Sequence, residues 1–199
     1  MSKLLVLKSS IMGENSTTNA LIDRYLDHRK ANGCEDEIVE HDLTTMNLPV
    51  LDGEIFAALR GAENPSQRAK DAIAFSDKLI AELKAADLVV IGAPMYNLNV
   101  PTHLKLWFDM VARARETFRY TETYPLGLVE GVDAVVISTR GGIHLGAETD
   151  VVTPYLRSVL GLMGITNVDF IYGEGFDIQP HGKRDGIADA HAQIAKRKA

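Results

Sequence analysis

The chain has 199 residues, a length that suits one domain with a single hydrophobic core, and we expect one domain over residues 1–199. Hydrophobic residues make up 46% of the sequence and charged residues 24%, a composition that excludes disordered and fibrous proteins. The net charge of −6 disfavours nucleic acid as a partner, and no apolar run is long enough to cross a bilayer.

Cysteine and histidine usage narrows the class further. Cys34 is the only cysteine, so no intrachain disulfide can form, and we expect a cytoplasmic protein without a membrane partner. The six histidines are scattered without the spacing of paired ligands, so we expect no metal site. The basic run over residues 196–198 is interpreted as a complement to the dipole of a C-terminal helix.

Segments with strand and helix patterns alternate along the whole chain. Continuous apolar runs predict strands that are buried on both faces, and one more polar strand is expected near an edge of the sheet. In chain order, the predicted strands cover residues 4–7, 37–42 (the polar one), 88–91, 133–138 and 168–172. Helical spacing predicts helices over residues 16–31, 66–85, 101–115, 151–163 and 184–198. The alternation indicates a parallel sheet with right-handed crossovers.

Two prolines and two long connections add detail to this pattern. Pro101 stands at the favoured first position of a helix, and Pro154 is tolerated only in a first helical turn. The connections over residues 43–65 and 116–131 are longer than a compact fold needs, and the second is rich in aromatic residues. Such loops often cover an active site or dock a partner, although they can equally cap the core.

The first strand is followed by a loop with several hydroxyl side chains. Ser10 lies in this loop, and Ser16, Thr17 and Thr18 lie at the start of the next helix. The free N–H groups and the positive dipole end of a helix N-terminus bind phosphate readily, and hydroxyls add further donors. Ser16 can alternatively serve only as a helix cap. The loop lacks both the Rossmann and the P-loop glycine motifs, which disfavours those two nucleotide-binding folds.

A second loop, after the third strand, offers a proline, an apolar side chain, an aromatic ring and an amide. The methionine and the tyrosine suit the surfaces of a flat heteroaromatic ligand, and the asparagine amide suits its polar edge. The residues are Pro94, Met95, Tyr96, Asn97 and Leu98. Alternatively, Asn97 is a turn residue and Tyr96 an ordinary core aromatic.

A third loop begins with Thr139 and Arg140 and continues with Gly141, Gly142 and His144. Adjacent glycines let the backbone approach a ligand closely, and their N–H groups can stabilise the negative charge that a reduced flavin acquires at N1 and O2. His144 can hydrogen-bond there too, although a Gly-Gly pair alone is more often only a turn. Because the carboxyl ends of parallel strands meet at one edge of a sheet, the three loops predict one crevice for a flavin phosphate and its ring.

At these loops the sequence resembles the family of FMN-dependent NADH-azoreductases and NADH:quinone oxidoreductases. The shared motifs are Lys-Ser-Ser at 8–10, Ala-Pro-Met-Tyr-Asn at 93–97, Phe-Arg-Tyr-Thr-Glu at 118–122, Arg-Gly-Gly-Ile-His at 140–144 and Thr-Pro-Tyr at 153–155. The resemblance covers nearly the whole chain. It implies a flavodoxin-like α/β fold, a three-layer sandwich in which helices cover both faces of a five-stranded parallel sheet. It also implies one bound FMN per chain and a homodimer with shared active sites.

The resemblance also assigns roles to the three loops. It implies that Ser10 and residues 16–18 hold the FMN phosphate, that residues 95–98 line the flavin ring, and that residues 139–142 bind its polar edge. Pro94 and His144 belong to the same predicted cofactor site.

Members of this family reduce FMN with NADH or NADPH and pass two electrons through flavin N5 to a quinone or an azo compound, in a ping-pong cycle. Because this chemistry belongs to the cofactor, we expect no indispensable catalytic side chain. His144 and Tyr120 are candidates for assisting proton delivery. Phe118 and Tyr120 are expected as walls of the acceptor pocket, with Leu162 also in it. Arg60 can meet an acidic or nucleotide substrate, or it can equally be a surface residue.

Two leucines depart from the family pattern. Leu98 follows the Met-Tyr-Asn motif where several relatives have phenylalanine, and Leu162 stands where some relatives have an aromatic residue. A less aromatic pocket loses roughly 0.5–1.5 kcal/mol of stacking for each aromatic pair. The acceptor preference therefore does not follow from the resemblance.

Two other functions fit the same residues. A flavodoxin-type electron carrier would stay monomeric and would not react with NADH, but the loop over residues 116–131, which is suited to cover the ring, weighs against it. A dimeric binding module with FMN as ligand or sensor would bind FMN without turnover. If a dimer forms, we expect Leu104, Trp107 and Phe108 in its contact, unless they are core residues that face the sheet.

Overall fold

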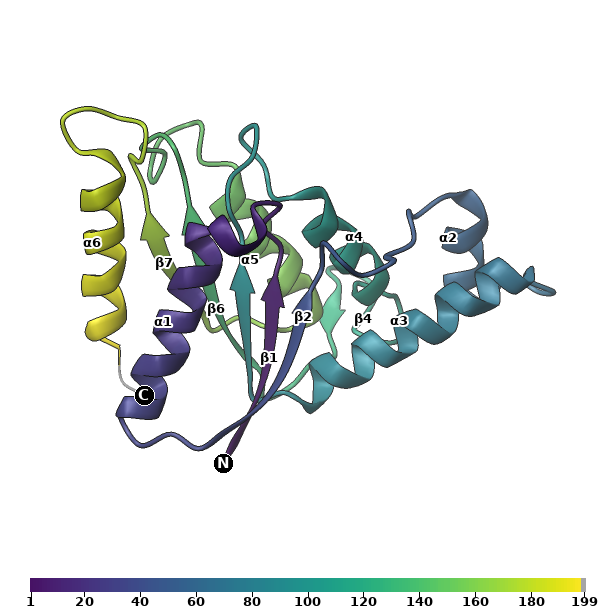
Figure 1. Ribbon diagram of the computed structural model, residues 1–199. Coiled ribbons are helices and arrows are strands. Elements are labelled where there is room, and N and C mark those ends of the chain that lie inside the picture. Colours follow the sequence, from purple (N-terminus) through teal and green to yellow (C-terminus); the bar gives the residue numbers. More distant parts are fainter. Residues whose placement is uncertain (198–199) are drawn as a thin grey trace.

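The computed structural model of the protein describes residues 1–197, and its centre is a five-stranded parallel sheet (Figure 1). The strands are β1 (Ser2–Lys8), β2 (Asp36–Asp42), β3 (Leu88–Gly92), β6 (Asp133–Thr139) and β7 (Val168–Gly173). Their order in the sheet is β2-β1-β3-β6-β7, so the polar strand β2 lies at an edge, as predicted. Strand β2 lies on one side of β1, and the next strand of the sheet, β3, lies on the other side of β1. Parallel sheets bind ligands beside such a switch point.

Helices cover both faces of this sheet and complete a three-layer sandwich. They are α1 (Thr17–Ala31), α2 (Gly53–Leu59), α3 (Gln67–Ala85), α4 (Thr102–Val111), α5 (Val152–Met163) and α6 (Gly182–Ala195). Helices α1 and α6 lie on one face, and α3, α4 and α5 lie on the other (Figure 1). This arrangement confirms the predicted α/β class with helices on both faces of the sheet.

Alternate residues of the central strand β1 pack against the two helical layers. Leu4 and Val6 belong to the core beneath α1 and α6, while Leu5 and Leu7 belong to the core beneath α3, α4 and α5. Each of these side chains is at most 1% exposed. A strand that is buried on both faces must be apolar at every position, which explains the continuous apolar run in the sequence.

Hydroxyl side chains set two of the helix boundaries. Ser16 is the N-cap of α1, and its Oγ accepts a hydrogen bond from the Asn19 N–H at 3.1 Å. Helix α4 ends at Val111 rather than at residue 115, because the Thr117 hydroxyl donates to the Val111 carbonyl oxygen at 2.6 Å and accepts from the Arg113 N–H at 3.0 Å. The prediction of a longer helix was wrong because this side chain replaces the next helical hydrogen bond.

Both prolines lie at helix starts. Pro101 is the N-cap of α4, one position before the predicted one, and Pro154 lies in the first turn of α5, as predicted. At neither position would a backbone N–H, which proline lacks, form a hydrogen bond within the helix. Helix α6 ends at Ala195, so Lys196 and Arg197 follow it, and Lys198 lies outside the described residues.

The apolar face of α4 belongs to the core. Leu104 and Trp107 are fully buried and Phe108 is 1% exposed, all within the cluster that packs beneath α3, α4 and α5. The rings of Trp107 and Phe108 meet edge to face, with their centroids 5.2 Å apart. The prediction that these three residues form part of a dimer contact was therefore wrong, since they face the sheet.

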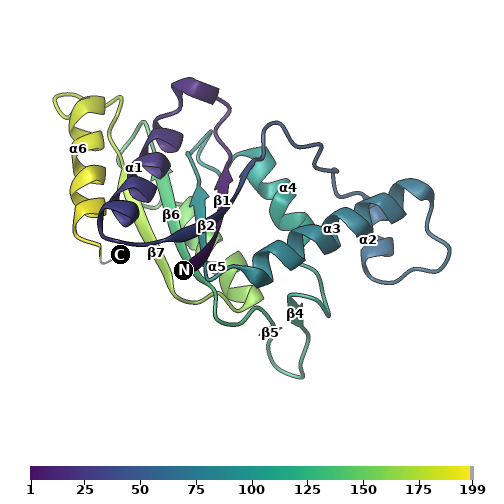
Figure 2. The same ribbon diagram turned by 60° about the horizontal axis from the view of Figure 1, so that its bottom comes forward.

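The two long connections contain elements that the sequence pattern did not predict. The first forms α2, which packs against α3, where Arg68 pairs with Asp52 and Glu54. The second forms a short hairpin of β4 (Phe118–Arg119) and β5 (Leu126–Gly127), which docks near the C-terminal end of α5 (Figure 2). No helix among residues 1–197 is both long and apolar enough to cross a membrane.

The hairpin leaves no room for a side chain at Gly127. A Cβ atom there would overlap the backbone of Gly164, so we expect Gly127→Ala to lower the free energy of unfolding by about 1–3 kcal/mol in urea titrations. Gly161→Ala is the matched control, because a Cβ at that position in α5 meets no atom within 4 Å and alanine favours a helix. Equal stability of the two variants would contradict the docking of the hairpin on α5.

Candidate functional site

The carboxyl ends of β1, β3, β6 and β7 enclose a cavity of about 380 Å³, called here the strand-end cavity. Residues from all three predicted loops line it. They are Ser10, Ser16, Thr17, Thr18, Pro94, Met95, Tyr96, Thr139, Arg140 and Gly141. Asn97, Leu98, Gly142 and His144 are not among the lining residues, although Asn97 and Gly142 directly follow lining residues and the other two lie within three positions of one.

The N-terminus of α1 offers the strand-end cavity free backbone donors. The Asn19 N–H donates a hydrogen bond to Ser16 Oγ, but the N–H groups of Thr17 and Thr18 have no acceptor within residues 1–197. Because these groups stand at the positive end of the helix dipole, they suit a phosphate. The hydroxyls of Thr18 and Thr139 hydrogen-bond at 2.6 Å and join this helix end to the end of β6.

The loop after β3 forms a tight hairpin turn. Tyr96 and Asn99 exchange both backbone hydrogen bonds, at 2.9 and 3.0 Å. Asn97 and Leu98 have φ values of 49° and 65°, as a type I′ turn requires at its two central positions. Both are exposed at the tip, so Asn97 acts as a turn residue, while Met95 and Tyr96 face the cavity. The Tyr96 hydroxyl lies 3.0 Å from Ser10 Oγ and links the first two loops.

The glycine pair presents its N–H groups rather than its carbonyls. The Gly141 and Gly142 carbonyl oxygens accept hydrogen bonds from the N–H groups of Asp177 and Gly175, each at 2.9 Å. Within residues 1–197 the two glycine N–H groups have no acceptor. A pair of free backbone donors at a cavity suits a carbonyl oxygen or a developing negative charge. His144 lies beyond them, with its Nδ1 2.8 Å from Thr149 Oγ1.

Arg140 plays a structural part that the sequence did not reveal. Its guanidinium is fully buried and forms ion pairs with Asp150 at 3.0 Å and Glu174 at 3.1 Å. The group also stacks on the Tyr172 ring, 4.8 Å from its centroid. Its side chain is thus committed to the protein, and only its position in the loop places it beside the cavity.

Glu174 extends this network to the backbone of the third loop. Its Oε1 accepts hydrogen bonds from the His144 and Leu145 N–H groups, both at 2.9 Å, in addition to the bond from Arg140. The carboxylate therefore holds the segment that follows the glycine pair. Sequence reasoning missed this residue because it lies far along the chain, just after β7.

The loop after β7 contributes further cavity residues that sequence reasoning missed. Phe176, Asp177 and Lys183 line the strand-end cavity, as do Met12 and Asn15 of the first loop. The end of the fifth predicted strand was the available signal, since every strand of a parallel sheet delivers its carboxyl end to the same edge. Lys183, in the first turn of α6, adds a positive charge to this cavity, and Asp177 adds a negative one.

The four residues predicted for the substrate pocket lie together, but elsewhere. Arg60, Phe118, Tyr120 and Leu162 line a second cavity of about 220 Å³, called here the substrate-side cavity, which shares no residue with the strand-end cavity. The Phe118 and Tyr120 rings meet edge to face at 5.4 Å, and Arg60 lies over the Phe56 ring at 5.1 Å. One chain thus holds the two predicted halves of the site apart.

Known proteins have similar sequences and a similar fold. The family described as having a flavodoxin-like fold matches residues 2–197. The FMN-dependent NADH:quinone oxidoreductase 4 of Burkholderia lata is 63% identical over 194 residues, which cover 98% of each chain. The FMN-dependent NADH:quinone oxidoreductase of Aeromonas salmonicida is 55% identical, over 98% of this chain and 97% of its own. The structure of an azoreductase from Bacillus anthracis is similar with a TM-score of 0.89 and 27% identity, over 98% of each chain.

The chain therefore belongs to the flavodoxin-like family, which confirms the predicted fold class. Within that fold it belongs to the family of FMN-dependent NADH:quinone oxidoreductases, because it is similar to these proteins at high identity along nearly its whole length. The resemblance drawn from its loop motifs is confirmed.

The pairing of Arg140 with Asp150 predicts a pH-dependent stability. Burial disfavours the charged form of Asp150, but hydrogen bonds from Thr153 and from Arg140 outweigh this effect and hold the pKa of Asp150 below its usual range. A lowered pKa stabilises the folded state above the ordinary carboxyl pKa of about 3.9 and loses that effect as the pH falls through the folded value.

We therefore expect Asp150→Asn to lower the free energy of unfolding by about 1–3 kcal/mol from pH 7 down to about pH 5, and by progressively less as the pH falls below about 4 toward the lowered pKa of Asp150. Urea titrations across this pH range measure the difference from the wild type. Asp27→Asn, an exposed change on α1, is the control and should stay within about 0.5 kcal/mol. A difference that stays constant with pH would exclude ionised Asp150 as its source.

Proposed function

We propose that the protein is an enzyme, an FMN-dependent NAD(P)H:quinone oxidoreductase that also cleaves aromatic azo compounds. The observation that carries this proposal is the strand-end cavity, which offers one set of donors for a phosphate and another for the polar edge of a ring. The names of the relatives support it, since two curated relatives are FMN-dependent NADH:quinone oxidoreductases and a structural relative is an azoreductase. The single cysteine suits the reducing cytoplasm, where we place the protein.

The residues of the strand-end cavity fit FMN. The free N–H groups of Thr17 and Thr18, with their hydroxyls, would hold the phosphate. Met95 and Tyr96 would line the ring, and the free N–H groups of Gly141 and Gly142 would meet its polar edge.

When bound in the strand-end cavity, FMN would supply the two-electron redox chemistry between the nucleotide donor and the acceptor. The residues of the chain bind, orient and exclude water. Glu174 and Arg140 hold the loop that carries the glycine N–H groups, so these donors need no rearrangement when charge develops. The Tyr120 hydroxyl, on a side chain that is 63% exposed, is free to give a proton to the acceptor.

We further propose that the protein is a homodimer in which each subunit completes the other's active site. The strand-end and substrate-side cavities share no residue within one chain, so a second copy is the simplest means to bring them together. Large apolar side chains are exposed around both cavities, as expected of surfaces that are covered in an assembly. They are Ile11, Met12, Leu98, Ile143 and Leu145 near the first, and Phe56, Tyr120 and Tyr124 near the second.

An electron carrier is the competing function. A carrier needs no second cavity lined by aromatic and apolar side chains, and it would expose one flavin edge to a protein partner. The substrate-side cavity therefore favours the enzyme, and its aromatic and apolar side chains suit the flat ring of an acceptor such as a quinone.

Anaerobic reduction tests the proposed reaction. We expect NADH or NADPH to bleach the flavin band near ~450 nm in the FMN-loaded protein, and a benzoquinone to restore it, because donor and acceptor use the site in turn. Stopped-flow absorbance measures both half-reactions. Bound FMN that neither nucleotide bleaches would overturn the enzyme and favour the electron carrier.

A heterodimer tests the shared active site. Thr17→Glu puts a carboxylate at the first turn of α1, where it suits the helix dipole but repels a phosphate, so this variant should fold and fail to retain FMN. Leu162→Glu puts a charge in the substrate-side cavity and should impair acceptor reduction. Each homodimer should have little activity, whereas the heterodimer, purified through two different tags, should show about half of the wild-type activity per dimer.

The heterodimer has one intact composite site only if each site draws on both subunits. If each site lies within one chain, the heterodimer stays as inactive as its parents. Analytical ultracentrifugation of the two parent variants is the control, since both must remain dimers for the comparison to hold.

A further inference from the structure

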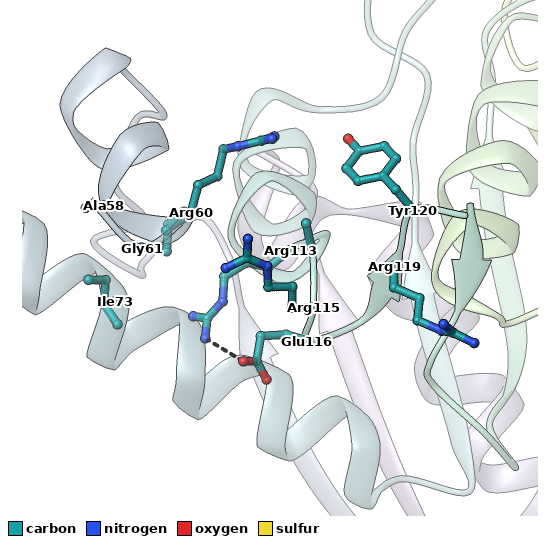
Figure 3. Close-up of a pocket in the computed structure, with 11 residues that line it drawn as sticks. Ala58, Arg60, Gly61, Ile73, Arg113, Arg115, Glu116, Arg119 and Tyr120 are labelled. Atoms are coloured by element: carbon teal, nitrogen blue, oxygen red, sulfur yellow. Dashed lines mark ion pairs between the residues drawn. The ribbon is translucent and has the colours of Figure 1, made fainter. Parts of the chain in front are cut away.

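A third cavity, of about 590 Å³, adjoins the substrate-side cavity and is called here the arginine cavity (Figure 3). It lies among α2, α3 and the segment that follows α4. The two cavities share Leu59, Arg60, Arg113, Ala114 and Tyr120, so one ligand can reach into both. The larger cavity differs from its neighbour in its charge.

Four arginines line the arginine cavity, and only one of them is neutralised. Arg113 pairs with Asp77 at 2.6 Å and with Glu116 at 3.4 Å. Arg60, Arg115 and Arg119 form no ion pair within residues 1–197. A surplus of positive charge therefore gathers here on a chain whose net charge is −6.

The backbone at Arg115 indicates a use for its side chain. Arg115 has a φ of 75°, which is a left-handed backbone conformation. This conformation is unfavourable in free energy for any residue that has a side chain. Its N–H donates to the Phe118 carbonyl oxygen at 2.7 Å, a bond that any residue except proline would form. Glycine or asparagine would suit this conformation better, so the local fold does not explain an arginine at this position.

The side chains are arranged around a shared space. In Figure 3, Arg60 and Tyr120 approach the cavity from opposite sides with Arg115 below them, while Arg119 extends away. Guanidinium groups bind phosphate, carboxylate and sulfonate through paired hydrogen bonds, and a phenol hydroxyl can add one more.

We propose that the arginine cavity binds an anionic group of a substrate whose aromatic ring occupies the adjoining substrate-side cavity. This inference rests on the proposed function and names a property of the substrates of that site. The anionic group has two possible sources: the diphosphate of the nucleotide donor, or a sulfonate or carboxylate on the acceptor. Arg115, with Arg60, holds it in either case.

The first arm of the test measures binding without turnover. ADP carries the diphosphate but no nicotinamide, and in FMN-saturated protein it cannot use the cofactor's phosphate site. Calorimetric titration should show ADP binding that Arg115→Asn weakens about tenfold, as expected for one lost charged hydrogen-bond partner. Asparagine tolerates the left-handed conformation, so the melting temperature should not fall.

Two matched variants separate charge from structure. Arg115→Lys keeps the charge but not the paired geometry and should give an intermediate affinity. Arg24→Gln removes an exposed charge from α1, in the opposite helical layer, and should leave ADP binding unchanged.

The other arms identify the source of the anion. If it is the donor, Arg115→Asn shifts the NADH concentration needed for half-maximal bleaching but not the maximal rate, and ADP binding weakens in parallel. If it is the acceptor, the same variant raises the KM for a sulfonated benzoquinone and leaves that for neutral benzoquinone unchanged. Unchanged ADP binding, NADH dependence and sulfonated-quinone KM in Arg115→Asn would overturn the proposal. Failure of NADH and NADPH to bleach the flavin would overturn the proposed function instead, and the ADP titration would still report on the cavity.

Discussion

The buried guanidinium of Arg140 lies at the point where three segments of the candidate site converge. Its ion pairs with Asp150 and Glu174 connect the end of β6 to the start of α5 and to the loop after β7. A charge without solvent contact is tolerated only when its partners are close and well oriented, and here two carboxylates and the Tyr172 ring surround it. Because Glu174 also binds the backbone after the glycine pair, the loop beside the strand-end cavity depends on this network.

The doubly covered sheet explains why the site lies where it does. Strands β1, β3 and β6 are buried on both faces, so along their length they have no place for a polar side chain that lacks a partner. Polar groups collect where the strands end, and the parallel arrangement brings all these ends to one edge. Successive strands are added first on one side of β1 and then on its other side, and this change opens the space between neighbouring loops that becomes the strand-end cavity.

Different parts of the chain build the separate cavities. The strand-end cavity supplies donors for a cofactor, while the substrate-side and arginine cavities lie among α2, α4 and the hairpin of β4 and β5. Helix α2 and the hairpin come from the two long connections, so these additions to the sheet and its main helices build much of the substrate half of the proposed site. The exposed apolar residues around both halves are consistent with a second copy that covers them.

The sequence by itself determined the order of strands and helices along the chain, the edge position of β2 and the loops that meet at the strand-end cavity. These features follow from patterns among residues that are close together in the chain, such as alternating burial and the residues that start a helix. Only the tertiary structure decided what each surface packs against. Periodicity showed that Leu104 and Trp107 share an apolar face of α4 but not that this face meets the sheet. The partners of Arg140 and the grouping of Arg60 with Tyr120 join residues far apart in the chain, and no local pattern records such contacts, since they arise only when the separate elements pack together.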